Sequence, residues 1–234
     1  MPVIAFVSPK GGVGKTTSAT LLATQLASQA QVVVIDADAN HPVAAWAKLR
    51  GCPANLRVVS EGITEETIVD RIDEAASDAP FVIVDCEGSA NLTVAYAIGT
   101  ADLVVIPMQG SQLDASQAAR ALQLVKRAER QGRRTIPHVI LLTRTPAAIR
   151  SRTLTSIHEQ LRQHGVALLQ TELHERDAYR AMFSFGGTLD TLDPDHVGGL
   201  DKARVNARAY AAEIVALLKA KEGAPTRTPE REVA

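Results

Sequence analysis

Ten residues near the amino end combine the side chains that bind polyphosphates. The segment from Ser8 to Thr17 reads Ser-Pro-Lys-Gly-Gly-Val-Gly-Lys-Thr-Thr, with two lysines among three glycines. Glycines let the backbone take positive φ, so that successive N–H groups can surround an anion. A lysine can bridge the outer phosphates of a nucleotide, and the hydroxyl that follows it can bind Mg²⁺. These residue types predict a phosphate-binding loop for a magnesium nucleotide.

The residues on either side of this loop predict the elements that would position it. Val3 to Val7 is an uninterrupted apolar run, which is typical of a strand buried on both faces. Ser18 to Gln29 is rich in alanine and leucine at helical spacing. The free N–H groups at a helix N-terminus strengthen an anion site. Strand, glycine turn and helix together are the context that a P-loop requires.

Carboxylates end two later apolar runs, first Asp36 and Asp38 and then Asp85. Acids at the carboxyl ends of strands in an open α/β sheet face the crevice where ligands bind. Asp36 and Asp38 are two residues apart and therefore point to the same side of an extended chain. We predict that all three lie near the metal and the γ-phosphate, with Asp85 holding Mg²⁺ through its water shell. The alternative for the first two acids is that they cap a helix from about His41 to Leu49.

The loop departs from the general P-loop pattern at two positions. Pro9 stands where the general pattern has glycine, and Lys10 is an additional lysine. The segment Lys10 to Thr17 resembles the deviant phosphate loop of the ParA and MinD family of ATPases, and the order of elements resembles that family over nearly the whole chain. The resemblance is strongest to the small plasmid-partition ATPases and to the virulence ATPase that marks transfer-DNA for export. With the acids at 36 and 38, Glu175 to Ala178 contributes to the resemblance to the virulence ATPase.

This resemblance implies a role for individual residues. Lys10 reaches the partner's phosphates in a nucleotide-sandwiched dimer, Asp38 places the attacking water, and Asp36 lies close to the magnesium shell. Lys10, Lys15 and Asp38 thus form the catalytic set, and the predicted metal set is Thr16, Asp36 and Asp85. The predicted nucleotide contacts are Gly11, Gly12, Val13, Gly14, Lys15, Thr16, Thr17, Thr143, Arg144 and Arg176.

The function implied by the resemblance is a slow, magnesium-dependent ATP hydrolase that a partner protein stimulates. Its ATP-bound homodimer would bind DNA without sequence preference and act in plasmid or chromosome partition or in DNA transfer. The partner would be a small DNA-binding adaptor or a relaxosome component. We place the DNA contacts on a helix from about Gly199 to Lys221, where Arg204, Arg208 and Lys219 share a face. A solvated helix face is the alternative for these three residues.

Length and composition indicate one α/β domain with a doubly wound, mostly parallel sheet flanked by helices. We assign residues 1–221 to this domain and 222–234 to a polar tail expected to be disordered. Aromatic residues are 3% and hydrophobic residues 46%, so the core must consist mainly of valine, isoleucine, leucine and alanine. The net charge of -1 means that any DNA contact requires a local basic patch. The sequence shows no targeting segment or membrane span, and we expect a cytoplasmic, nucleoid-associated protein.

Three other functions on this fold stay open. A MinD-like regulator at the membrane surface requires a basic amphipathic helix at the carboxyl end, where this chain is polar. An iron–sulfur reductase like the nitrogenase iron protein requires a cysteine pair that bridges a dimer, and Cys52 and Cys86 are poorly placed for it. A metabolite ligase or kinase requires a second substrate pocket, of which the sequence gives no sign.

The remaining hydrophobic patterns predict further elements along the chain. Pro107 is expected to end its strand, and Asp114 to begin the following helix. Predicted strands lie at 56–60, 101–107, 136–143 and 166–170, and predicted helices at 64–77, 114–130 and 149–165.

Overall fold

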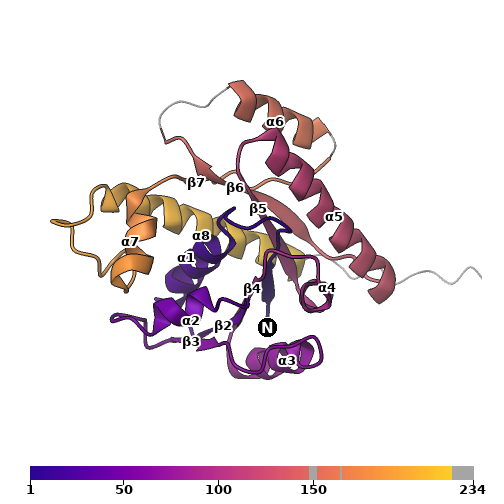
Figure 1. Ribbon diagram of the computed structural model, residues 1–234, viewed down its shortest axis with the longest axis horizontal. Coiled ribbons are helices and arrows are strands. Elements are labelled where there is room, and N and C mark those ends of the chain that lie inside the picture. Colours follow the sequence, from indigo (N-terminus) through magenta and orange to yellow (C-terminus); the bar gives the residue numbers. More distant parts are fainter. Residues whose placement is uncertain (148–151, 164, 223–234) are drawn as a thin grey trace, which may run out of the picture.

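The chain folds around one twisted parallel sheet. The computed structural model describes residues 1–147, 152–163 and 165–222, and within them the sheet has seven strands in the order β3-β2-β4-β1-β5-β6-β7. Figure 1 shows the sheet in the middle of the molecule with helices on both sides. The predicted doubly wound α/β fold is confirmed. Within the described ranges, no helix combines the length and apolar content that a bilayer span requires.

Most elements lie close to their predicted positions. The strands are β1 (Val3–Phe6), β2 (Val32–Ala37), β3 (Leu56–Val59), β4 (Phe81–Cys86), β5 (Leu103–Met108), β6 (His138–Thr145) and β7 (Leu173–His174). The helices are α1 (Lys15–Ala27), α2 (Pro42–Ala47), α3 (Ile68–Asp78), α4 (Leu92–Thr100), α5 (Gln112–Gly132), α6 (Arg152–Gln163), α7 (Asp177–Phe185) and α8 (Leu200–Glu222). The sequence patterns did not predict α4 or α7.

Two apolar layers cover the sheet, one on each face. Alternate residues of each strand point to opposite faces, and the helices divide accordingly: α1, α2, α7 and α8 pack on one face, while α3, α4, α5 and α6 pack on the other. The chain runs from β1 past β4 to β2, and later from β4 past β1 to β5. The carboxyl ends of these central strands meet where the direction of winding reverses, which is the usual ligand site of such sheets.

Pro107 does not end β5, contrary to the prediction. It pairs in register with Leu141 of β6, and the strand continues to Met108. The carbonyl of Val105 accepts a hydrogen bond from Val7 N, so residue 105, and by the period of two also residue 107, faces the side of β1. Because β1 has already ended at that level, the missing N–H of Pro107 removes no ladder hydrogen bond.

The segment 166–170 was wrongly predicted as the last strand. It contributes only an isolated bridge between Leu168 and Ile140. The next two backbone N–H groups, of Gln170 and Thr171, donate to the carboxylate of Glu213 on α8 at 2.6 and 2.8 Å. A helix side chain thus takes the N–H of Thr171, which by the period of two would continue the ladder to β6.

Two helix starts also differ from the predictions. Helix α5 begins earlier than Asp114, because Ser111 is its N-cap and the Ser111 hydroxyl accepts a hydrogen bond from Asp114 N at 3.1 Å. Helix α6 is described from Arg152, and the earlier part of the predicted helix includes residues 148–151, which lie outside the described residues.

Helix α8 packs its predicted apolar stripe onto α1. All six stripe residues are buried: Leu200, Ala203, Ala207, Ala211, Ile214 and Leu218. Tyr210 adds a fully buried ring whose hydroxyl donates to Ser18 O at 3.4 Å, at the start of the first helix. This contact ties the last helix to the turn of α1 that follows the phosphate-binding loop.

Substitutions at Tyr210 test how much this packing contributes to stability. We expect Tyr210→Ala to lower the free energy of unfolding by about 3–5 kcal/mol, because it leaves a cavity in a close-packed layer. Tyr210→Phe keeps the ring and loses only one long hydrogen bond, for an expected cost of about 1 kcal/mol. Urea unfolding of both variants measures the difference, and equal costs would mean that the hydroxyl rather than the ring stabilises the contact.

Candidate nucleotide-binding site

The predicted phosphate-binding loop connects β1 to α1 and has the backbone of an anion cradle. Gly12 and Gly14 have φ values of 74° and 94°, in the left-handed region that glycine adopts without strain. Gly14 is the N-cap of α1, so the free N–H groups of the first helical turn face the loop. The Lys15 side chain is buried and donates from Nζ to Lys10 O at 3.3 Å. The ammonium group is therefore held inside the loop.

A second glycine segment closes against this loop from the end of β4. A Cβ atom at Gly88 would lie 3.1 Å from Gly11 N and 3.2 Å from Lys15 Nζ. Any larger residue would press on the loop backbone and on the lysine. Gly88 thus allows the chain that follows Asp85 to lie against the predicted phosphate-binding loop.

Asp36 and Asp85 lie side by side at the carboxyl ends of β2 and β4. They are register partners, and both are fully buried. Asp36 Oδ2 accepts a hydrogen bond from Ala44 N at 2.8 Å, so this oxygen caps the first turn of α2, which was the alternative reading of this acid. Asp36 Oδ1 and both carboxylate oxygens of Asp85 are buried without a hydrogen-bond partner in the described part of the chain. Three oxygens in one place therefore need a ligand that can satisfy them.

The pKa values of Asp36 and Asp85 also show that buried negative charge lacks partners here. Burial, together with the charges of Asp36 and Asp38, raises the pKa of Asp85 to about 7, against the lowering effects of the nearby Thr16 hydroxyl and the Lys15 ammonium. Burial also raises the pKa of Asp36, although backbone hydrogen bonds from residues including Ala44 oppose the change. Hard oxygen ligands beside a hydroxyl suit Mg²⁺ or its water shell. The residues present therefore fit the predicted metal set of Thr16, Asp36 and Asp85.

Asp38 lies just beyond β2, partly exposed at the mouth of the site. Its Oδ1 atom accepts hydrogen bonds from Asn40 N at 2.9 Å and from Asn40 Nδ2 at 3.0 Å. Asn40 thus fixes the direction of the carboxylate, a role that sequence reasoning missed. The Asp-x-Asn spacing was a signal for such a turn, because short polar side chains often bond backbone two residues away.

Lys10 is held by a residue more than a hundred positions away. Its Nζ atom lies 2.6 Å from Asp114 Oδ1, and the other carboxylate oxygen of Asp114 accepts a hydrogen bond from the Ser111 hydroxyl. The Asp114 side chain is 2% exposed and the Lys10 side chain 34%. Gln109 adds a bond from Nε2 to Gly12 O at 3.0 Å. The sequence predicted a role for Lys10 and placed Asp114 at a helix start, but no local pattern could have paired two residues so far apart.

A cavity of about 250 Å³ opens beside the loop and brings together the other predicted nucleotide contacts. Thr143 Oγ1 donates to Val13 O at 2.7 Å, which joins the end of β6 to the loop. Arg144 has a positive φ of 51°, and Arg176 has a buried Nε atom without a partner among the described residues. The wall is lined by Gly14, Thr17, Thr143, Arg144, Leu173, His174, Glu175, Arg176, Tyr179, Arg180 and Phe183.

Asn206 shapes this cavity from behind, and sequence reasoning missed it. Its Oδ1 atom accepts hydrogen bonds from Tyr179 Oη at 3.0 Å and from His174 N at 3.2 Å. Its Nδ2 atom donates to Glu172 O at 2.8 Å. One side chain of α8 therefore positions two residues of the cavity wall.

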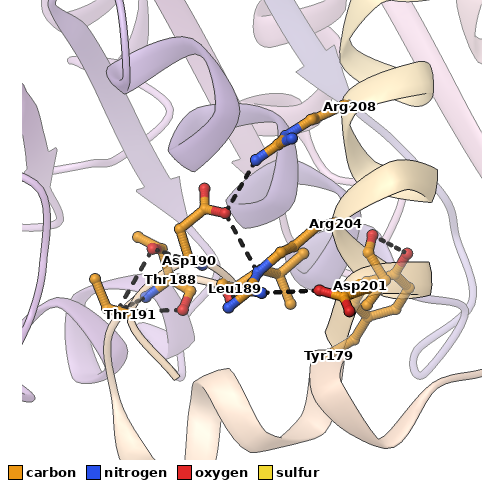
Figure 2. Close-up of polar contacts among 9 residues, drawn as sticks. Tyr179, Thr188, Leu189, Asp190, Thr191, Asp201, Arg204 and Arg208 are labelled. Carbon is orange, nitrogen blue, oxygen red and sulfur yellow. Dashed lines mark hydrogen bonds and ion pairs between the residues drawn. The ribbon is translucent and has the colours of Figure 1, made fainter. Parts of the chain in front are cut away.

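The three residues predicted to bind DNA do not form a free basic patch. Figure 2 shows Arg204 and Arg208 directed at Asp190, with Asp201 as a second partner of Arg204. Arg204 Nε also donates to Leu189 O at 2.9 Å. Lys219 lies fifteen residues after Arg204 on the same helix, which is about 22 Å at 1.5 Å per residue. Arg204 and Arg208 thus attach the segment 186–199 to α8. They are not simply solvated, as the alternative reading supposed, because both form ion pairs with Asp190.

Comparisons with known proteins agree with the fold and with the loop. The profile of the VirC1 protein family matches residues 1–218. A protein named ParA from Rhizobium radiobacter is 40% identical over 215 residues, which cover 92% of this chain and 96% of the relative.

Solved structures share the architecture at lower identity. Apo McdA from Cyanothece superposes with a TM-score of 0.77 at 17% identity, covering 92% of this chain and 99% of that one. An ATP complex of a Cyanothece McdA variant gives 0.74 at 18% identity, covering 93% and 96%. Since the family profile covers more than nine-tenths of the chain and the ParA relative is 40% identical, the protein belongs to the VirC1/ParA family.

Proposed function

We propose that the protein is an ATP-driven dimerisation switch that binds DNA in its dimeric state and acts in partition or DNA transfer. The observation that carries this proposal is the pairing of a glycine cradle around Lys15 with a second lysine, Lys10, at its exposed rim. A cradle for one nucleotide needs only the first lysine. Lys10 can therefore bind the phosphates of another site when it leaves its carboxylate partner, Asp114.

The binding step uses the loop and the buried acids. Loop N–H groups and Lys15 would hold the phosphates, and Thr16 with Asp36 and Asp85 would hold Mg²⁺. Magnesium would supply positive charge that neutralises both the phosphates and the carboxylates left without partners. Asp38, oriented by Asn40, would place the attacking water. Thr143, Arg144 and Arg176 would contact the base side of the nucleotide.

The switching step exchanges one charge partner of Lys10 for another. In the chain alone the ammonium group contacts Asp114, a carboxylate of the same subunit. A dimer that brings a second subunit's phosphates to the loop rim would offer Lys10 a more highly charged partner. ATP hydrolysis would then lower that charge and release the dimer. A small DNA-binding adaptor or a relaxosome component would stimulate this step, and the dimer would bind DNA through paired basic surfaces.

Substitution of Asp38 separates nucleotide binding from hydrolysis. We expect Asp38→Ala to bind Mg-ATP with nearly wild-type affinity and to lose about 100-fold or more in turnover, because the water is no longer positioned. Equilibrium binding of a fluorescent ATP analogue and phosphate release measure the two properties. Lys15→Ala serves as the reference that loses binding itself. Normal turnover by Asp38→Ala would contradict the assigned role.

Substitution of Asp114 tests the exchange at Lys10. We expect Asp114→Asn to shift ATP-dependent dimerisation to about thirtyfold lower protein concentration, because each of the two subunits loses a competing charge contact of about 1 kcal/mol. Sedimentation with a slowly hydrolysed ATP analogue measures this. Lys10→Ala should stay monomeric under the same conditions. If Asp114→Asn dimerises as the wild type does, the contact with Asp114 does not oppose dimerisation.

The raised pKa of Asp85 predicts how stability depends on pH. The folded chain binds a proton at Asp85 up to a pH of about 7, whereas the unfolded chain releases it near the ordinary value of 3.8. The free energy of unfolding of the magnesium-free protein should therefore fall as pH rises through this window, by up to about 4 kcal/mol.

Unfolding at about pH 5 and about pH 8 measures about 3 kcal/mol of this decline, because about two pH units of the window lie above pH 5. Asp85→Asn should remove most of it, and the exposed Asp78→Asn serves as the control. Added Mg²⁺ should restore stability at the higher pH for the wild type but not for Asp85→Asn. An unchanged pH profile in Asp85→Asn would show that the buried carboxylate is not the source.

A further inference from the structure

The end of α5 carries a concentrated positive charge that the proposed nucleotide site does not use. We define the basic face of α5 as Lys126, Arg127, Arg130 and Arg133. All four side chains are exposed, and none forms an ion pair with another described residue. The acid in this stretch, Glu129, is already engaged, because its Oε1 atom accepts a hydrogen bond from Ile136 N at 2.9 Å. Four positive charges therefore stand together with Glu129 as the one carboxylate beside them, and no ion pair joins it to any of the four.

The helix geometry directs these charges outward. The buried stripe of α5 consists of Ala118, Ala121, Val125 and Ala128. At 100° per residue, Lys126, Arg127 and Arg130 fall within about 100° of one another on the opposite side. Arg133 follows directly as the C-cap, with a φ of 48°. The four side chains thus share one solvent-facing surface.

The turn that ends α5 is fixed to its neighbours. Arg134 donates from Nη2 to Ala101 O at 2.8 Å and also bonds Gly99 O, which closes the end of α4. Arg134 N donates to Glu129 O at 3.2 Å. Arg134 is therefore occupied in the structure, and it holds the backbone that presents Arg130 and Arg133.

Stabilisation of the helix end does not explain this number of charges. Cations near a helix C-terminus interact favourably with the macrodipole, but the effect falls off within the last turn. Lys126 and Arg127 come before that turn, so the macrodipole does not explain them. The arginines of α8 differ from those of the basic face, because Arg204 and Arg208 both form ion pairs with Asp190.

The surface has the character of a polyanion site. None of the exposed large apolar side chains among the described residues lies between 126 and 133. A membrane-binding helix would carry such side chains, and so would the centre of a protein interface. Guanidinium groups match the geometry of phosphate oxygens. The face spans about 10 Å of helix, a length over which duplex DNA presents about six phosphate charges.

We propose that the basic face of α5 binds the phosphates of duplex DNA, without reading sequence, in place of the predicted surface on α8. This inference rests on the proposed function, because it locates the DNA contact of the ATP-bound dimer. Helix α5 begins near Asp114, which contacts Lys10 at the carboxyl ends of the strands. It ends with the basic face, near the amino ends of the strands (Figure 1). Nucleotide and DNA would thus be bound at opposite ends of one helix.

A fourfold glutamine variant tests the inference. Lys126, Arg127, Arg130 and Arg133 are all changed to Gln, and binding to a fluorescein-labelled duplex of about 30 base pairs is measured by anisotropy with a slowly hydrolysed ATP analogue. We expect at least about tenfold weaker binding near 0.1 M salt. The slope of log affinity against log salt should become shallower by about 3–4 for each basic face that contacts the duplex. Arg127→Lys, Arg130→Lys and Arg133→Lys combined should keep most of the affinity, because the charge remains.

A matched control removes the same charge elsewhere. Lys48, Arg57, Arg162 and Lys202 are exposed and lie elsewhere in the fold, and their change to Gln should alter DNA affinity by less than about twofold. Thermal unfolding and ATP turnover check that both variants fold. If the fourfold variant does not fold, the four single Gln variants replace it, each with an expected slope change of about 1.

The outcomes separate this inference from the function on which it rests. Unchanged DNA binding by the basic-face variant, or equal weakening by the control, overturns the inference while the switch stands. A wild-type protein that dimerises with ATP but binds only vesicles containing phosphatidylglycerol, and no duplex, also overturns it. A wild-type protein that shows no ATP-dependent dimer contradicts the proposed function itself.

Discussion

The organisation of this protein depends on negative charge that is buried at the carboxyl edge of the sheet. Because β2 pairs in register with β4, Asp36 and Asp85 are placed side by side in a fully buried position. Backbone donors satisfy only one of their four oxygens. Burying unpaired carboxylates lowers the stability of the fold. These carboxylates lie beside the glycine loop that holds Lys15. A bound magnesium nucleotide would turn this unfavourable arrangement into a favourable one.

The loop is stabilised by the same neighbours that shape the ligand site. Gly88 approaches the loop from β4, Thr143 bonds it from β6, and Gln109 bonds it after β5. Three strands of the sheet thus fix one turn. Such support from rigid elements suits a site whose donors must be aligned before the ligand arrives. Lys10 is the exception, since it is held by a single carboxylate and remains partly exposed.

Positive charge is distributed unevenly over the helices. On α8, Arg204 and Arg208 pair with Asp190 and hold the segment 186–199, which Trp46 also binds through its indole N–H to Gly187 O at 3.1 Å. On α5, the basic face has no such partners among the described residues. A helical pattern of basic residues therefore has two meanings, and the position of acids that are distant in sequence decides between them.

Local sequence patterns were sufficient to predict the fold class, the place of the glycine loop and the acids at the ends of β2 and β4. These features follow from local composition: apolar runs form buried strands, and glycines with lysines form an anion cradle. Local patterns failed where the decisive partner lies far along the chain. Pro107 stays in β5 because β1 ends early, the backbone of 170–171 bonds Glu213, and Lys10 contacts Asp114. These pairings become visible only in the folded chain, because long-range contacts depend on which elements pack together, and that information is spread over the whole sequence.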